Sequence, residues 1–303
     1  MCYNIYIMIK KCEICPRKCK INRENGDIGY CNSGDKVKIA LISKHNFEEP
    51  CISGKGNKKE GSGTVFFSGC NLRCVFCQNH EISQEGIGKE IEIEELAKKF
   101  IELQNMNVNN INLVTPTMYV PQIIEAIKIA RKEGLNLPII YNSNGYENVE
   151  TIKLLNGYID VYLPDLKYYS DNLAIKYSKA PNYFETATKA IKEMYNQVGG
   201  PIFDEYGIIK RGVIVRHLVL PNHLQNTKRI LKWIKCNLKE DVYVSVMAQY
   251  FPTFKANKFE EINRKLSIKE YKEIERYIYL EGIENGYMQD LESNEEKYVP
   301  KFT

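Results

Sequence analysis

Three cysteines on one short stretch constrain this chain more than any other feature. Residues 64–80 read TVFFSGCNLRCVFCQNH, in which Cys70, Cys74 and Cys77 have the spacing C-x3-C-x2-C. The run 64–67 is β-branched and aromatic and is bounded by glycines, which predicts a buried strand leading directly into the cysteine loop. Three thiolates at this spacing predict a metal centre at the end of that strand.

The number of cysteines narrows the kind of metal. Structural zinc takes four protein ligands, usually as C-x2-C pairs, and iron–sulfur clusters are normally held by four cysteines on short loops. A set of three leaves either a remote fourth ligand or one iron with an open coordination position. A zinc knuckle and three buried thiols are the alternatives to an iron–sulfur cluster.

The sequence around these cysteines resembles a known family. The motif C-x3-C-x2-C with Phe76 just before the third cysteine resembles the signature of the radical S-adenosylmethionine (SAM) superfamily. The longer stretch GCNLRCVFCQN resembles the pyruvate formate-lyase activating-enzyme-like branch. The resemblance implies a [4Fe–4S] cluster on Cys70, Cys74 and Cys77, with SAM chelating the fourth iron and Phe76 beside the cofactor.

A second cysteine set lies near the amino terminus. Cys12, Cys15, Cys19 and Cys31 have the spacing C-x2-C-x3-C-x11-C in a short, polar segment. A segment of this kind cannot bury a core of its own, so a structural metal is expected to hold it together. Zinc and a second iron–sulfur cluster both fit four thiolates, and unmetallated thiols are the remaining alternative.

The rest of the chain alternates strands and helices. Six strand candidates lie at 64–68, 111–115, 138–143, 160–164, 212–219 and 242–248, and helical stretches lie at 92–105, 121–134, 147–156, 183–197, 224–238 and 268–282. This alternation is typical of parallel βα units. Six units are too few for a closed eight-stranded barrel, and they match the partial (β/α)6 barrel that the resemblance implies.

We therefore divide the chain into three parts. A Cys-rich amino-terminal module with its linker spans 1–60, the barrel spans 61–260, and a carboxy-terminal helix and tail span 261–303. The linker contains His45, Glu48 and Glu49 in a pattern similar to one in the same branch. No role follows from that pattern, and we interpret the segment as a loop that packs the small module on the barrel.

Ligands in parallel architectures gather at the carboxyl ends of the strands. There the resemblance implies cofactor contacts from Asn144 on the third strand, from Asp165 and Lys167 on the fourth, and from Arg216 on the fifth. A carboxylate suits the ribose or sulfonium of SAM, and cations suit its carboxylate. The family's G-G-E after the second strand is absent, because Thr-Pro-Thr stands at 115–117. The histidine expected after the sixth strand is also replaced.

The resemblance implies a reaction as well. An electron reaches the cluster from a donor such as flavodoxin or ferredoxin, and SAM is cleaved to methionine and a 5′-deoxyadenosyl radical that abstracts a hydrogen atom. Relatives in this branch activate glycyl-radical enzymes, so such an enzyme is an expected partner. The alternatives are a radical SAM enzyme for a small molecule or another macromolecule, and a redox or zinc module that does not cleave SAM.

Charge and composition bear on location and partners. Residues 1–60 hold 12 Lys and Arg against 7 Asp and Glu, but four metal-bound thiolates would cancel much of this excess, so we do not expect a nucleic-acid partner. No run approaches the ~18 apolar residues of a membrane span, and we expect no membrane association. Seven of ten cysteines fall in the two metal-like sets, which favours a reducing, cytoplasmic setting.

Overall fold

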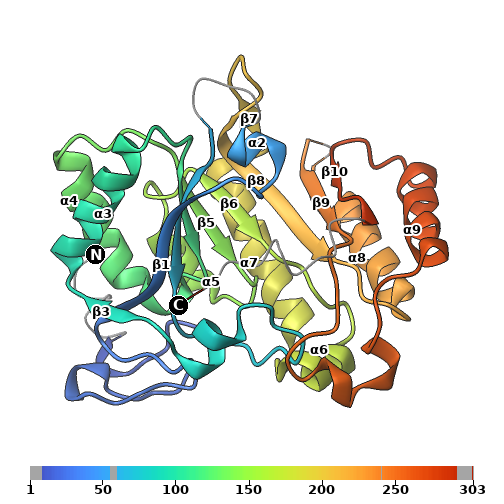
Figure 1. The fold of residues 1–303 in the computed structure, drawn as a ribbon, viewed down its shortest axis with the longest axis horizontal. Coiled ribbons are helices and arrows are strands. Elements are labelled where there is room, and N and C mark those ends of the chain that lie inside the picture. Colours follow the sequence, from blue (N-terminus) through green and yellow to red (C-terminus); the bar gives the residue numbers. More distant parts are fainter. Residues whose placement is uncertain (1–8, 55–59, 240, 292–301, 303) are drawn as a thin grey trace.

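The computed structural model describes residues 9–54, 60–239, 241–291 and 302, and Figure 1 shows their arrangement. Within these residues a ten-stranded sheet has the order β10-β9-β8-β6-β5-β4-β2-β1-β3, with β7 paired to β8. The strands are β1 (Val37–His45), β2 (Ser62–Phe67), β3 (Lys89–Ile91), β4 (Ile111–Val114), β5 (Ile139–Ser143), β6 (Val161–Pro164), β7 (Ile202–Phe203), β8 (Ile209–Leu218), β9 (Tyr243–Met247) and β10 (Gly286–Met288). The helices are α2 (Pro50–Ser53), α3 (Ile93–Asn105), α4 (Val120–Lys132), α5 (Val149–Leu154), α6 (Asp171–Ser178), α7 (Tyr183–Val198), α8 (Leu224–Asn237) and α9 (Ile268–Leu280).

The predicted alternation of strands and helices is confirmed. The six expected strands are β2, β4, β5, β6, β8 and β9, and they lie side by side in parallel. The six expected helices begin and end within two residues of their predicted bounds. The sheet path ends at β10 on one side and at β3 on the other, so the barrel is partial, as predicted.

The two edges of the barrel contain strands outside the six-unit pattern. β10 adds to the sheet in parallel with β9. β1, which lies inside the segment assigned to the amino-terminal module, pairs antiparallel with β2 and therefore belongs to the same sheet. No described helix combines the length and the apolar character needed to cross a membrane.

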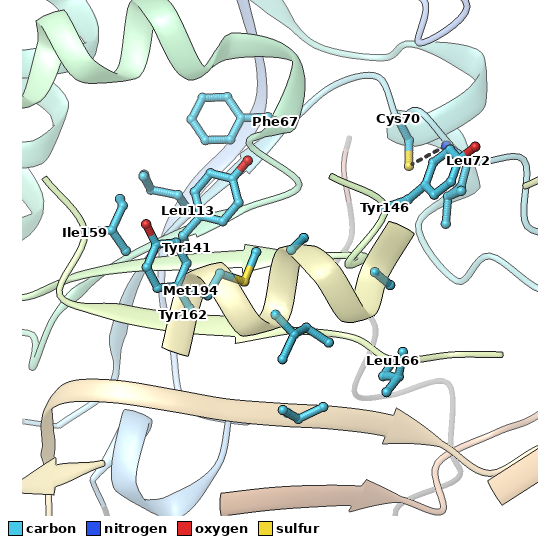
Figure 2. Packing of buried hydrophobic residues seen from close by; sticks show 14 of the residues in the cluster. Phe67, Cys70, Leu72, Leu113, Tyr141, Tyr146, Ile159, Tyr162, Leu166 and Met194 are labelled. Atoms are coloured by element: carbon cyan, nitrogen blue, oxygen red, sulfur yellow. Dashed lines mark hydrogen bonds between the residues drawn. The ribbon is translucent and has the colours of Figure 1, made fainter. Parts of the chain in front are cut away.

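Alternate side chains of the parallel strands point to opposite faces of the sheet, as the period of two requires. Tyr141 of β5 and Tyr162 of β6 pack outward in the main core, where Met194 of α7 lies near them (Figure 2). Their neighbours Ile140 and Leu163 belong to a separate, inner cluster. The outer face is therefore covered by helices, and the inner face surrounds the interior of the barrel.

The short helix α2 fills one end of this interior. Cys51 and Ile52 are buried against the inner side chains of β5, β6 and β8, which are Ile140, Val161, Leu163, Ile209 and Ile214. In Figure 1, α2 lies at the top, away from the amino-terminal loops at the lower left. The interpretation of this linker as a loop packing one module on another is therefore wrong, because Cys51 and Ile52 pack inside the barrel.

His217 of β8 points outward and is fully buried. Its Nδ1 donates to the Leu166 carbonyl at 2.7 Å, and its Nε2 accepts from the Thr227 hydroxyl at 2.9 Å. Burial lowers the pKa of His217 from 6.5 to about 4. The folded protein thus binds this proton less well than the unfolded chain, so the resulting stability is complete above pH 6.5 and is lost as the pH falls toward 4.

We predict that His217→Gln reduces this acid sensitivity. Between about pH 7 and pH 4.5, the free energy of unfolding should fall by roughly 2 kcal/mol more in the wild type than in the variant. Urea unfolding at both pH values measures the difference. Equal losses in the two proteins would show that His217 does not contribute to acid unfolding.

Candidate functional site

A cavity of about 770 Å³ opens at the carboxyl ends of the strands. Its volume lies in the range of small-molecule sites. Every residue that the sequence predicted for the SAM site lines this cavity: Cys70, Phe76, Cys74, Cys77, Asn144, Asp165, Lys167 and Arg216. Residues that are up to 146 positions apart in the chain are thus brought to one place because the parallel strands end at the same edge.

Each sulfur of the cysteine loop lies within reach of a hydrogen-bond donor. The Leu72 N–H and the Asn144 side-chain amide each lie 3.4 Å from the sulfur of Cys70, and Figure 2 shows the first contact. The Ser178 hydroxyl donates to Cys74 at 3.0 Å. The Ser83 hydroxyl and the Cys77 sulfur are 3.2 Å apart. Donors of this kind stabilise thiolates and tune the clusters they bind.

Burial acts against free thiolates at these positions. Burial raises the pKa of Cys70 to about 12 and that of Cys74 to about 11, and it also raises the pKa of Cys77. A thiol with such a pKa is protonated at neutral pH unless a positive partner replaces its proton. Bound iron would be such a partner for the three sulfurs.

The donor set fits the [4Fe–4S] cluster that the sequence implies. Three soft sulfur ligands face one cavity, and each is supported by a neutral hydrogen-bond donor. Among the described residues, no three His, Cys, Asp or Glu side chains stand in the arrangement that a single metal ion requires. A four-iron cluster is larger than one ion and takes ligands that are further apart.

Of the predicted cofactor contacts, Asn144 lies directly beside the cysteine loop and Phe76 belongs to it. Asn144 bonds to the Cys70 sulfur and donates to Asn71 Oδ1 at 2.7 Å, which fixes the amide against the loop. Phe76 is buried and packs edge-on against Tyr250, with ring centroids 5.6 Å apart. Phe76 therefore holds the loop against the segment that follows β9.

Asp165 and Lys167 form an ion pair at the end of β6. Lys167 Nζ lies 2.5 Å from Asp165 Oδ2, and both side chains are less than one-fifth exposed. Burial opposes the charge on Lys167, but Asp165 and the sulfurs of Cys74 and Cys77 raise its pKa. The lysine is thus a fixed cation beside the cysteine loop, within the field of its sulfurs.

Arg216 lines the same cavity, but its guanidinium already has two partners. Nε and Nη2 bond to the two carboxylate oxygens of Glu49 at 2.7 and 2.5 Å, and Nη2 also bonds to Glu48. Both glutamates belong to the linker whose pattern suggested no role. The structure therefore does not present Arg216 as a free cation for the carboxylate of SAM, because this linker folds into the barrel.

Thr115 and Thr117 replace the missing G-G-E and point in different directions. Thr115 lines the cavity with φ of 58°, a left-handed conformation that is uncommon for a β-branched residue. Thr117 donates to Glu147 at 2.6 Å inside the core, where burial raises the pKa of Glu147 to about 7. Thr115 is thus the residue of this pair that a ligand can reach.

The four amino-terminal cysteines also come together. Arg23 is buried among them, with its Nη2 3.5 Å from the sulfur of Cys31. Against the effect of burial, Cys31, Cys12 and Cys15 all raise the pKa of the same guanidinium by their proximity. A Cβ atom built on Gly29 would lie 3.3 Å from the Cys31 sulfur and 3.9 Å from the Cys19 sulfur, so these two sulfurs lie on the same side of Gly29. The four cysteines, all among the described residues, do not stand in the arrangement of a single-ion site, although sulfur is the donor type that both zinc and iron–sulfur clusters take.

Short contacts join the two cysteine sets. The Cys70 N–H donates to the Cys31 carbonyl at 3.1 Å. Arg17 Nε donates to the Asn71 carbonyl at 2.8 Å, and its guanidinium stacks over Tyr30 at 4.1 Å. The amino-terminal module therefore contacts the cysteine loop directly through Cys31 and Arg17.

Four residues of the site have no role that the sequence alone indicates. Ser83 and Ser178 lie beside the sulfurs of Cys77 and Cys74, and Glu48 and Glu49 neutralise Arg216. Ser178 is 104 residues from its partner, and a lone serine gives no signal at that distance. The paired glutamates were visible as a pattern, but only the fold shows which cation they meet.

Comparisons with known proteins agree with this geometry. The family model "Radical SAM superfamily" matches residues 64–234, which is more than half of the chain. An uncharacterised protein of Methanocaldococcus jannaschii is 34% identical over 90% of this chain and 75% of its own length. The pyruvate formate-lyase-activating enzyme of Clostridium pasteurianum is 24% identical over 70% of this chain and 84% of its own length.

A solved structure shows the same fold. SuiB of Streptococcus suis bound to S-adenosylmethionine matches with a TM-score of 0.50 and 12% identity, over 73% of this chain. The chain spans about half the length of that protein. The cysteine loop, the partial parallel barrel and the matched family model lead to one conclusion. This chain belongs to the radical SAM superfamily.

Proposed function

We propose that this chain cleaves SAM reductively and uses the product radical to abstract a hydrogen atom from a substrate. The observation that supports the proposal most strongly is that three cysteine sulfurs and the polar ends of the neighbouring strands line one cavity. A bound [4Fe–4S] cluster would deliver one electron to the sulfonium of SAM, which gives methionine and a 5′-deoxyadenosyl radical.

The residues of this chain supply binding, orientation and a dry setting for that chemistry. Cys70, Cys74 and Cys77 would hold the cluster, and their neighbouring donors would stabilise the sulfur charge. Asp165 and Lys167 would orient SAM beside it. Phe76 would exclude water next to the third cysteine.

We expect Asp165→Asn to weaken SAM binding. The substitution removes a carboxylate from a poorly exposed site and leaves Lys167 without its partner, which should cost on the order of 2–4 kcal/mol, or roughly 30- to 1,000-fold in affinity. Calorimetric titration of reconstituted protein with SAM measures the change. Glu150→Gln is the matched control, because its exposed pair with Lys153 lies outside the cavity. Equal affinity in both variants would show that Asp165 is only a strand-end residue.

The proposal also covers the protein that donates the electron to the cluster and the substrate that donates the hydrogen atom. A flavodoxin or ferredoxin suits a cytoplasmic enzyme of this kind. The similarity to the activating enzyme of Clostridium pasteurianum favours a glycyl-radical enzyme as the hydrogen donor. A glycyl-radical EPR doublet on an added partner enzyme would support activation. Transfer of deuterium from a labelled small molecule into 5′-deoxyadenosine would favour a small substrate instead.

We also propose that Cys12, Cys15, Cys19 and Cys31 bind a metal that stabilises the amino-terminal module. Cys15→Ala should lower the thermal stability or solubility of the protein and leave the EPR signal of the core cluster intact. Metal analysis of a variant that lacks Cys70, Cys74 and Cys77 isolates this site. Zinc or iron with sulfide there would identify the metal, and the absence of any metal would refute the proposal.

A further inference from the structure

A layer of polar side chains lies inside the barrel, in a region to which the proposed chemistry assigns no role. We define the polar layer as Glu48, Glu49, Asn112, Arg216 and Ser245. Asn112, Arg216 and Ser245 are inner-face residues of β4, β8 and β9, and the two glutamates reach them from the segment before α2. Four of the five line the same cavity as the cysteine loop, and Asn112 donates to Glu48 at 3.1 Å.

The polar layer carries an excess of negative charge. Arg216 is paired with both Glu48 and Glu49, so two carboxylates share one guanidinium. Burial raises the pKa of Glu49, but Arg216 more than offsets this and lowers it below its usual value. Over the whole cavity, the lining includes four acids and two bases, besides His45. A group that enters the layer therefore meets a formal charge of −1.

The layer also holds hydrogen-bonding atoms that the described residues leave unused. Ser245 is 1% exposed, and its Oγ lies near Glu49 without a hydrogen bond of normal geometry. Asn112 Oδ1 and, further along the cavity wall, Gln289 Oε1 are buried without a partner. Buried polar atoms are normally hydrogen-bonded, and leaving one unpaired is costly. Both amide oxygens are acceptors, so a group that satisfies them must donate.

We propose that the polar layer is a recognition subsite for a cationic group of the substrate that carries N–H donors, an alkylammonium or a guanidinium. Such a group would balance the excess charge and donate to Glu48, Glu49 or Ser245, which line the cavity. Its chain would extend along the cavity, so that the reacting C–H bond faces the cysteine loop. This inference rests on the proposed function, because it assigns the substrate class of that same cavity.

An anionic substrate group does not suit the layer. Glu49 occupies Nε and Nη2 of Arg216, and Glu48 shares Nη2. A carboxylate or phosphate that approached this guanidinium would be repelled by two fixed carboxylates in a setting of low exposure. The arginine holds the glutamates in place, and the glutamates determine the charge of the partner.

Three probes of equal length test the charge preference: pentylammonium, 1-pentanol and pentanoate. Each is titrated into the reconstituted protein with SAM present, and binding is followed by ligand-observed NMR. We expect pentylammonium to bind about tenfold more tightly than pentanol, and pentanoate to bind most weakly. Tighter binding of pentanoate, or no saturable binding of pentylammonium, would overturn the inference.

Variants locate the site of binding. Glu48→Gln should weaken pentylammonium binding about five- to tenfold and leave pentanol binding unchanged. Ser245→Ala should also weaken pentylammonium binding. Because this substitution disturbs no hydrogen bond of normal geometry, it tests the subsite even if Glu48→Gln lowers stability. Glu95→Gln removes the same charge from an exposed position on α3 and should change nothing. Equal probe affinities in all three folded variants would refute the subsite.

Failure of this inference can be told apart from failure of the proposed function. Formation of 5′-deoxyadenosine together with a preference for pentanoate would refute only the subsite. Absence of 5′-deoxyadenosine from protein with an intact reduced cluster and bound SAM would refute the proposed function, whatever the probes bind.

Discussion

Replacing Cys70, Cys74 and Cys77 together with Ala should abolish the EPR signal of the reduced cluster and reduce 5′-deoxyadenosine formation to background. The three cysteines line one cavity, and burial raises the pKa of each thiol, so bound iron is expected to replace their protons. Anaerobic reconstitution, followed by EPR with and without SAM, measures the first effect. An assay of 5′-deoxyadenosine measures the second.

An isolated cysteine provides the control. Cys236 lies in α8 and does not line the cavity. Replacing Cys236, which is exposed, should leave both signals unchanged. A wild-type EPR signal that persists in the triple variant, or one that does not shift when SAM is added to the wild type, would contradict the assignment of the cluster.

Arg216→Met should strongly destabilise the protein. It leaves Glu48 and Glu49 as carboxylates without a cation in a site where all three side chains are at most 13% exposed. Removing one partner of a buried ion pair costs about 3–5 kcal/mol. Urea unfolding of wild-type and variant protein at neutral pH measures the loss.

Two further variants separate the ion pairs from the loss of an arginine as such. Arg276→Met removes an exposed arginine from α9 and should change the unfolding free energy by less than about 0.5 kcal/mol. Replacing Glu48 and Glu49 with Gln in the Arg216→Met background should recover part of the loss, because it removes the uncompensated charge. A loss in Arg216→Met no larger than in Arg276→Met would contradict the buried network.

The barrel and the cysteine loop could be predicted because their signals are local. The β-branched runs that became β2, β4, β5, β6, β8 and β9 need only their own residues and flanking glycines or polar residues to be recognised. The rule that parallel strands place ligands at their carboxyl ends, together with the family resemblance, pointed to Asn144, Asp165, Lys167 and Arg216. All four line the cavity, and their contacts with SAM stay a prediction. Their spatial convergence follows from topology.

The contents of the barrel could not be predicted, because they depend on contacts between distant segments. Glu49 lies 167 residues from Arg216, and neither local sequence indicates that the two side chains form an ion pair. α2 is only four residues long, too short for helical periodicity to appear. β10, at Gly286–Met288, is three residues long and is a strand only because β9 offers it an edge to pair with.

The hydrogen-bond donors around the cluster site escaped prediction for a related reason. Ser178 ends α6, and its hydroxyl reaches Cys74 only because that helix packs beneath the cysteine loop, where the Arg73 and Val75 N–H groups bond to the Ser178 and Tyr177 carbonyls. A serine at a helix end is ordinarily interpreted as part of a cap or a turn. Tertiary packing gives it a place in the site.

The most direct test is anaerobic reduction of the reconstituted wild-type protein with SAM, followed by measurement of 5′-deoxyadenosine and methionine over time. Cleavage of SAM by a radical SAM enzyme should give both products in equal amounts, above the level in the triple cysteine variant, even before a substrate is identified. No 5′-deoxyadenosine from protein that carries a reduced [4Fe–4S] cluster and binds SAM would contradict reductive SAM cleavage by this chain.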